Sequence, residues 1–154
     1  MSNFFGLGPI HFAPQPNDSI RELHWKAEGI LEYLHENEKW LRQFPTGLVD
    51  ERLALWQPLA GLLAKAIEQP DLAMDARLEA QRVWAEEMRL SAMFIITMCV
   101  HARTESARKR FADDPEQLEE FIKRLEQARP ASLKILSTED RNFLRDKGFL
   151  WPEE

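Results

Sequence analysis

The chain has 154 residues, of which 44% are hydrophobic and 30% charged, and 26 acidic against 20 basic side chains give a net charge of -6. This length and composition fit one soluble globular domain and exclude a disordered or fibrous chain. The negative net charge means that binding to nucleic acid would need a local basic patch. The one cysteine, Cys99, cannot form an internal disulfide, and the first residues have no basic n-region, so we expect a cytoplasmic protein.

Residues 1–18 combine apolar side chains with glycine and proline, which is a pattern too broken for a helix or a strand. We expect this arm to lie across a groove of the core. The alternative is an exposed arm that docks on another protein. The remaining residues, 19–154, are predicted to form a helical bundle domain.

A first helix is predicted to begin at a cap formed by Asp18 or Ser19, with Glu22 completing a capping box with Ser19. It is predicted to end at Phe44, where proline and glycine follow. Its apolar positions follow steps of three and four residues, which gives one buried seam. A second face of this helix carries Trp25, Tyr33 and Trp40. That aromatic face is either packed against neighbouring helices inside a bundle or open to a partner.

A second helix is predicted from about Asp50 to Gln69, with a kink or a fresh start at Pro58. After it, residues 71–114 contain neither glycine nor proline, which predicts a long central helix over about 72–111 with its N-terminal cap at Asp71 or Asp75. At about 1.5 Å per residue this helix would overhang a compact domain. It is therefore expected to be bent, broken near Asp75, or extended into a homodimer.

The middle of the long helix, residues 90–102, carries no formally charged side chain, so we predict that it is buried on all sides. Beyond it, Asp114 and Pro115 predict the start of a helix that Arg129 and Pro130 end. Residues 132–136 are either a turn of helix or an extended link. A last helix is predicted from Ser137 to about Leu144, with Gly148 as its C-terminal cap and an apolar tail, residues 149–151, folded back on the core. The fold class is all-α, with about five helices packed around the long one.

The sequence offers no catalytic or metal-binding motif. Glu32 and His35 form one Glu-x-x-His, but a di-metal site in a helical bundle needs a second such pair, and none is present. Cys99 and His101 are two residues apart, so on a helix their side chains diverge and form no local dyad. We therefore predict no metal, no cofactor and no catalytic residue, although an enzyme remains an alternative.

Charged side chains give two further interpretations. The paired acids Glu86 and Glu87 are expected to be solvated surface. A basic cluster at the end of the long helix predicts, as an alternative function, contact with a nucleic-acid backbone. The same residues also suit the helix dipole, which is the simpler explanation. The cluster consists of Arg103, Arg108, Lys109 and Arg110.

For function, an acidic helical chain with exposed aromatic side chains is typical of a protein-binding module. Immunity proteins, inhibitors and accessory subunits of bacterial or phage systems are of this physical type. The predicted partner is another protein, of basic character, and no membrane is involved. The predicted contact residues are Trp25, Tyr33, Trp40, Glu28, Glu32 and Glu36. Another alternative is a helical enzyme or ligand carrier whose pocket is lined by Trp84, Met88, Phe94 and Met98.

Overall fold

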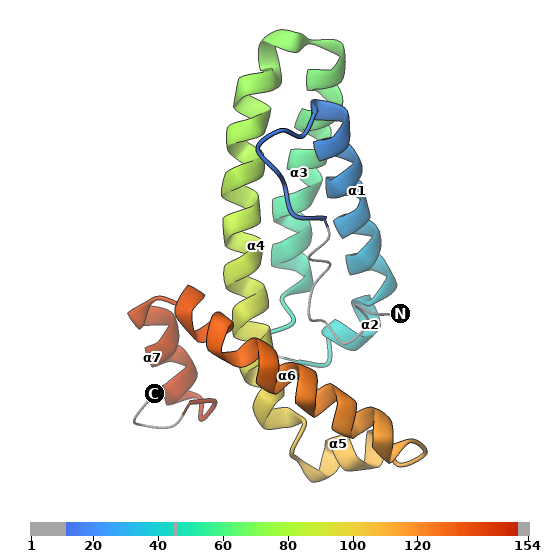
Figure 1. The fold of residues 1–154 in the computed structure, drawn as a ribbon, viewed down its shortest axis with the longest axis vertical. Coiled ribbons are helices and arrows are strands. Elements are labelled where there is room, and N and C mark those ends of the chain that lie inside the picture. Colours follow the sequence, from blue (N-terminus) through green and yellow to red (C-terminus); the bar gives the residue numbers. More distant parts are fainter. Residues whose placement is uncertain (1–11, 45, 151–154) are drawn as a thin grey trace. The chain divides into compact units, whose positions relative to one another are not determined.

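The structure is a computed structural model that describes residues 12–44 and 46–150, and within them the chain forms seven α-helices and one 3-10 helix and no strand. The predicted all-α class is confirmed. In chain order the helices are α1 (Ile20–Glu36), α2 (Glu38–Leu41), α3 (Val49–Glu68), the 3-10 helix η2 (Pro70–Leu72), α4 (Ala73–His101), α5 (Glu105–Arg110), α6 (Pro115–Ile135) and α7 (Thr138–Asp146) (Figure 1).

The described residues fall into two compact units. We call residues 12–88 the N-terminal unit and residues 89–150 the C-terminal unit, and α4 contributes residues to both. The predicted division into an arm of residues 1–18 and a bundle of residues 19–154 stays a prediction, because residues 1–11 lie outside the described part. No helix of the described residues is long and apolar enough to cross a membrane.

In the N-terminal unit, α1 begins as predicted, because the Glu22 N–H donates to the Ser19 hydroxyl at 3.1 Å. The predicted single helix over residues 19–44 is wrong. It is divided at Asn37, whose φ of -107° and ψ of 10° are not helical. The side-chain amide of Asn37 donates to the Tyr33 carbonyl at 2.8 Å, and such local bonds compete with the helix. α2 therefore follows as a separate short helix.

The connection from α2 to α3 is tight. A Cβ on Gly47 would lie 2.0 Å from the Leu41 carbonyl oxygen, so the close backbone approach requires glycine there. Leu48 follows with a φ of 50° and ends the turn. α3 then runs without interruption through Pro58, where we predicted a kink or a new start, and closes at Gln69 as predicted.

The core of the N-terminal unit lies where α1, α3 and the first part of α4 run side by side (Figure 1). Each helix turns a stripe of small or aliphatic side chains toward the other two. The buried members of these stripes are Leu23, Ala27, Ile30 and Leu34 on α1, Leu59, Leu63 and Ala66 on α3, and Ala76, Ala80 and Val83 on α4. Trp56 of α3 is also buried and completes the core.

The long helix is shorter than predicted, because α4 ends at His101 rather than near residue 111. Thr104, in an extended conformation, caps α5 by accepting from the Ala107 N–H, and its hydroxyl donates to the His101 carbonyl at 2.7 Å. This cap starts a new helix where the sequence suggested continuity. The predicted burial of the uncharged middle, residues 90–102, is confirmed for residues 90–99 and for Ala102, whereas Val100 and His101 are half-buried.

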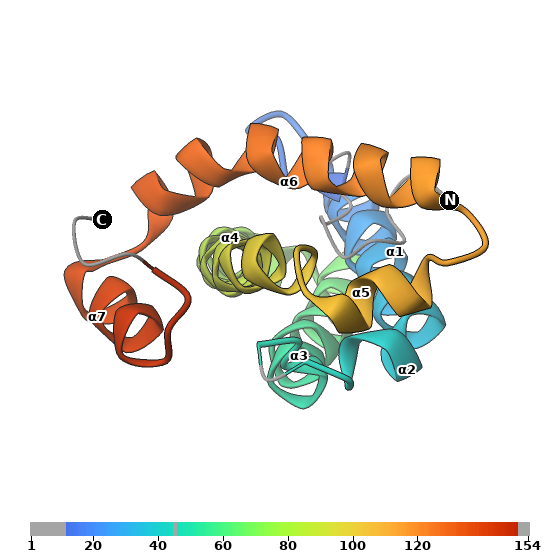
Figure 2. The same ribbon diagram turned by 90° about the horizontal axis from the view of Figure 1, so that it is seen from below.

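In the C-terminal unit, α5 and α6 form a hairpin (Figure 2), and α6 begins at the predicted cap, where the Gln117 N–H donates to Asp114 at 3.1 Å. The predicted end at Arg129 and Pro130 is wrong, because α6 continues to Ile135. Proline removes one backbone donor, but packing can outweigh that loss. Phe121 and Leu125, before the proline, are buried, and Ser132 after it is buried as well.

The last helix, α7, follows the prediction closely. The Asp140 N–H donates to Ser137 at 3.1 Å, and Gly148 has a φ of 86°. The N–H groups of Gly148 and Phe149 close the helix end on the Arg145 and Leu144 carbonyls, which is the Schellman arrangement. The tail folds back at least as far as Leu150, which packs in a core cluster with Ala92, Met93, Ile96, Leu136 and Leu144. Trp151 lies outside the described residues.

Candidate protein-binding site

The exposed face of α1 carries a line of acidic side chains that begins with a tryptophan. Steps of three and four residues separate Trp25, Glu28, Glu32 and Glu36, so all four lie on one side of the helix. All four are exposed, and Trp25 keeps 63% of its surface open to solvent. We call these four residues the α1 face. Four of the six predicted partner-binding residues are therefore brought together.

Trp25 is held on one side by an aromatic residue of the arm. The ring centroids of Phe12 and Trp25 are 5.3 Å apart with an angle of 57° between the planes. The Phe12 ring lies over Gly29, because a Cβ at that position would come within 2.4 Å of a ring carbon. Residue 12, the first described residue of the predicted arm, thus packs on α1 rather than away from it.

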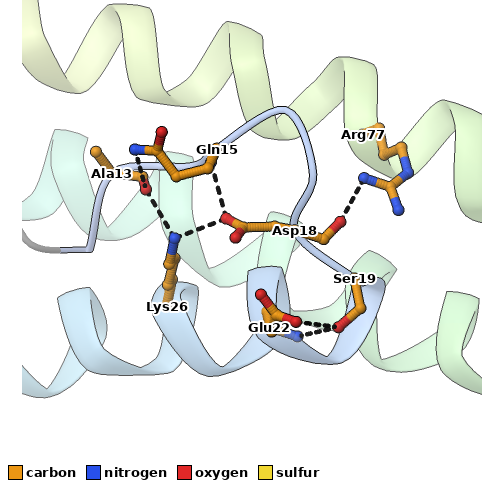
Figure 3. A network of polar contacts seen from close by, with 7 residues as sticks. All are labelled: Ala13, Gln15, Asp18, Ser19, Glu22, Lys26 and Arg77. Atoms are coloured by element: carbon orange, nitrogen blue, oxygen red, sulfur yellow. Dashed lines mark hydrogen bonds and ion pairs between the residues drawn. The ribbon is translucent and has the colours of Figure 1, made fainter.

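The described part of the arm is fixed by a polar network (Figure 3). The Asp18 carboxylate accepts from the Gln15 N–H at 2.8 Å and from the Lys26 ammonium at 2.6 Å. Lys26 also donates to the Ala13 carbonyl at 2.9 Å, and Arg77 of α4 donates to the Asp18 carbonyl at 2.7 Å. Burial alone would raise the pKa of Asp18, but the hydrogen bonds from Lys26 and Gln15 outweigh it and hold the pKa below its usual range.

The other two predicted aromatics are placed differently. Tyr33 is buried, and the Arg52 guanidinium lies 5.9 Å from the centre of its ring. Trp40 is half-buried in α2 and meets Phe44 edge to face, with centroids 5.3 Å apart. The interior alternative that the sequence left open thus holds for Tyr33. The break at Asn37 moves Trp40 onto a separate helix.

The structure also shows a buried ion pair that the sequence did not reveal. Arg52 of α3 contacts Glu87 of α4 at 2.7 Å, and both side chains are at least 98% buried, with 1% and 2% exposed. The Trp56 indole N–H donates to the same carboxylate at 2.8 Å. The prediction that Glu87 is solvated surface is therefore wrong. Hydrogen bonds from Arg52 Nε, at 3.1 Å, and from Trp56 replace part of the water that a carboxylate loses on burial.

Sequence spacing did contain a weak signal for this pair. Glu87 follows Val83 and Ala80 by four and seven residues, so it continues the buried stripe of α4. Arg52 stands four residues before Trp56 on the buried side of α3. A charge on each of two buried stripes indicates an internal pair, but only the fold shows that the two positions meet.

The basic cluster is divided between the turn after α4 and helix α5. Arg103 forms an ion pair with Glu126 and donates to the Cys99 carbonyl at 2.6 Å. Arg108, Lys109 and Arg110 are exposed in the last turn of α5. Nearby His101 has a pKa below its usual value, first because it is partly buried and second because Arg110 is close. Nucleic-acid binding by these residues stays an alternative prediction.

The residues predicted to line a ligand pocket do not line the two pockets described here. Trp84 belongs to the N-terminal unit and meets Trp56 edge to face, with ring centroids 6.3 Å apart. Phe94 and Met98 belong to the C-terminal unit and are fully buried. One pocket, of about 140 Å³, lies between the arm and α4 of the N-terminal unit. A larger one, of about 320 Å³, lies in the C-terminal unit beside Cys99, Arg103 and Arg129.

Within residues 12–44 and 46–150, no group of three or more histidine, cysteine or acidic side chains is arranged to hold a metal ion. Cys99 is buried, and burial raises its thiol pKa, although Arg129 works in the opposite direction. Comparison of the chain with models of protein families, with curated proteins and with solved structures gave no match.

Proposed function

We propose that the chain is a non-enzymatic protein-binding module and that the α1 face is its contact surface. The observation that carries this proposal is an exposed tryptophan at the head of three exposed glutamates on one helix side. The partner is a protein with a basic, partly apolar surface. An immunity or inhibitor protein, or an accessory subunit of a bacterial or phage system, is the type of module that this surface suits.

Trp25 supports the proposal through its exposure. Tryptophan is large and is usually buried to a high degree, and it is enriched among the residues that contribute most to binding energy. The Phe12 ring restricts the positions open to the indole. A side chain that is already ordered loses less conformational entropy on binding. Trp25 is therefore suited to act as the anchor of an interface.

The three glutamates support a basic partner. Glu28 is 3.4 Å from His24, and its side chain is still 56% exposed. Glu32 and Glu36 are exposed further along the same side. A line of like charges attracts a partner of opposite charge and speeds association more than it strengthens the complex. The glutamates therefore guide the approach of a basic partner and select against acidic ones, while Trp25 supplies the apolar area that is buried in the complex.

The first experiment places a photo-crosslinking amino acid at position 25 in the native cell. Leu78, which is 58% exposed in the same unit, is the control position. The expected result is a basic protein crosslinked from position 25 and not from position 78. Equal crosslinking from both positions, or only to abundant proteins, would contradict the proposal.

The second experiment titrates that protein, once purified, against Trp25→Ala and its control Leu78→Ala. Removing a central tryptophan is expected to weaken binding by about 2 kcal/mol or more, while Leu78→Ala leaves the affinity unchanged. Circular dichroism should show an unchanged helix content for both variants. An unaltered affinity of Trp25→Ala would mean that the partner binds elsewhere.

The third experiment tests the charges. Changing Glu28, Glu32 and Glu36 together to glutamine should lower the association rate roughly tenfold or more at low salt and flatten its salt dependence. The matched control makes the same change at Glu68, Glu116 and Glu119, which are exposed elsewhere. If the control variant slows association equally, net charge rather than the α1 face is responsible.

A further inference from the structure

The pocket of about 140 Å³ between the arm and α4 lies within the N-terminal unit, and the proposed protein binding does not use it. Its wall combines apolar and polar side chains. The apolar residues come from the arm, α1 and α4, namely Pro14, Pro16, Leu23 and Ala80. The polar residues are Gln15, Arg77 and Gln81. A largely apolar wall with a few polar groups is typical of a site for a small molecule.

Arg77 is half-buried and brings one positive charge to this wall. Its Nη1 donates to the Asp18 carbonyl at 2.7 Å, while the Asp18 carboxylate points away from it, toward Gln15 and Lys26 (Figure 3). Among residues 12–44 and 46–150, no carboxylate forms an ion pair with Arg77. A guanidinium has five N–H groups, so most of those of Arg77 are available to an anionic ligand.

The size of the pocket limits what such a ligand can be. A volume of about 140 Å³ equals that of roughly five water molecules at about 30 Å³ each. It is well below the value of about 300 Å³ at which pockets for drug-sized ligands begin. The apolar residues of the wall favour hydrocarbon beside the charged group, because a polar group buried there would lack a partner. The ligand is therefore a small anion with a short apolar chain.

We propose that this pocket binds a short-chain monocarboxylate of about the size of propionate. The carboxylate pairs with Arg77, because a guanidinium matches two carboxylate oxygens with two parallel N–H groups. The side-chain amides of Gln15 and Gln81 offer further N–H donors. The alkyl chain lies against Leu23 and Ala80. A bound acid thus contacts both the arm and α4, and it stabilises the folded arm.

The test is an NMR titration of the full chain, with the backbone nitrogens isotope-labelled. Sodium propionate is the probe, propionamide is its uncharged control of the same shape, and sodium chloride keeps the ionic strength constant. Propionate is expected to bind in a saturable way and to shift the backbone signals of Gln15, Arg77 and Gln81. Propionamide should bind roughly 10- to 100-fold more weakly, since it lacks the charge-assisted hydrogen bonds. Equal binding of the two probes, or shifts at these residues that do not saturate, would overturn the proposal.

Substitutions locate the site. Arg77→Met should weaken propionate binding by roughly the same 10- to 100-fold factor. Arg21→Met, at an exposed position of α1 in the same unit, is the control and should leave binding unchanged. Thermal unfolding checks that both variants fold. If Arg77→Met does not fold, Arg77→Lys keeps the charge without the paired donors and should still favour propionate over propionamide. Equal losses in the two methionine variants would overturn the assignment to Arg77.

A carboxylate could also reach the pocket as the C-terminus of another protein. Acetyl-trialanine, which ends in such a carboxylate, is titrated in the same way to separate this source from a free acid. Weaker binding of the peptide than of propionate is expected, because the pocket has no room for a chain that continues beyond a few atoms. Tighter binding of the peptide would overturn the assignment to a free acid.

Discussion

The two units of the chain bury charge in different ways. The N-terminal unit encloses Arg52 with Glu87, and it nearly encloses Lys26 with Asp18, whose side chains are 14% and 7% exposed. The C-terminal unit has an apolar cluster at its centre, and its pairs Arg89–Asp140 and Arg103–Glu126 each keep an arginine 40% or more exposed.

The difference separates two sources of stability. A buried ion pair needs both partners and their hydrogen bonds. Removing one partner therefore lowers the free energy of unfolding strongly, even where the intact pair contributes little to it. An apolar cluster depends on volume and shape, so its weak point is an empty space. We therefore expect the N-terminal unit to be sensitive to charge and pH, and the C-terminal unit to be sensitive to side-chain size.

The largest effect is expected from Glu87→Ala, which leaves Arg52 buried without its carboxylate. The free energy of unfolding, measured by urea denaturation, should fall by about 3 to 5 kcal/mol. The double change of Arg52→Met with Glu87→Leu should recover most of that loss, because neither charge remains. Arg82→Ala, which breaks an exposed pair with Glu79, is the control and should cost at most about 1 kcal/mol. A loss from Glu87→Ala no larger than the control would remove the contrast between the units.

Leu144→Ala tests the apolar cluster, where this side chain is fully buried. The cavity should lower the free energy of unfolding by about 2 to 5 kcal/mol. Ile135→Ala, at a position 42% exposed, is the control and should cost much less. Hydrogen exchange can show which unit is affected. Faster exchange confined to residues 89–150 would sharpen the comparison, and equal acceleration in α1 and α3 would mean that the units unfold together.

Asp18→Asn tests the pH sensitivity of the N-terminal unit and should cost roughly 1 to 3 kcal/mol at neutral pH. Because the folded pKa of Asp18 lies below its ordinary value of 3.8, its stabilisation is fully present above that value. It is lost as the pH falls through the lower pKa of the folded state. Urea denaturation of both proteins between about pH 6 and pH 2.5 should show the difference shrinking at the acid end. A difference that stays constant over this range would contradict the role given to the carboxylate.

The smallest effects come from two glycines and should have opposite signs. Gly148→Ala introduces a side chain at a φ of 86°, where nothing lies within 4 Å, so only backbone strain of about 1 to 2 kcal/mol is expected. Gly61→Ala, within α3 and also in open space, should stabilise by roughly 0.5 to 1 kcal/mol. Thermal unfolding distinguishes them. A stabilising Gly148→Ala would mean that the α7 cap does not need its glycine.

The parts of the fold that sequence predicted correctly are set by near neighbours. Ser19, Asp114 and Ser137 each cap a helix by bonding an N–H three residues later, and Gly148 closes α7 through the last turn of that helix. These signals are complete within a few residues of chain. The burial of residues 90–99 could also be predicted from the sequence, because this part of the helix has no charged side chain that would favour contact with solvent.

The parts that were predicted wrongly depend on distant residues or on competing local signals. Glu87 lies 35 residues from Arg52, and no spacing rule connects the two. Pro130 carries a helix-ending signal that packing of α6 overrides. For the α1 face, helical spacing predicted that the glutamates and Trp25 share one side, whereas the burial of Tyr33 was left open by the sequence and is seen only in the fold.

The position of Phe12 over Gly29 bears on peptide mimicry of the proposed interface. A synthetic peptide copying α1 alone would present Trp25 without its neighbouring ring and would lack the lysine and aspartate bonds that hold the arm in place. A competitor for the partner should therefore extend from residue 12 to residue 36 and be stapled along its buried side, so that arm and helix are copied as one surface.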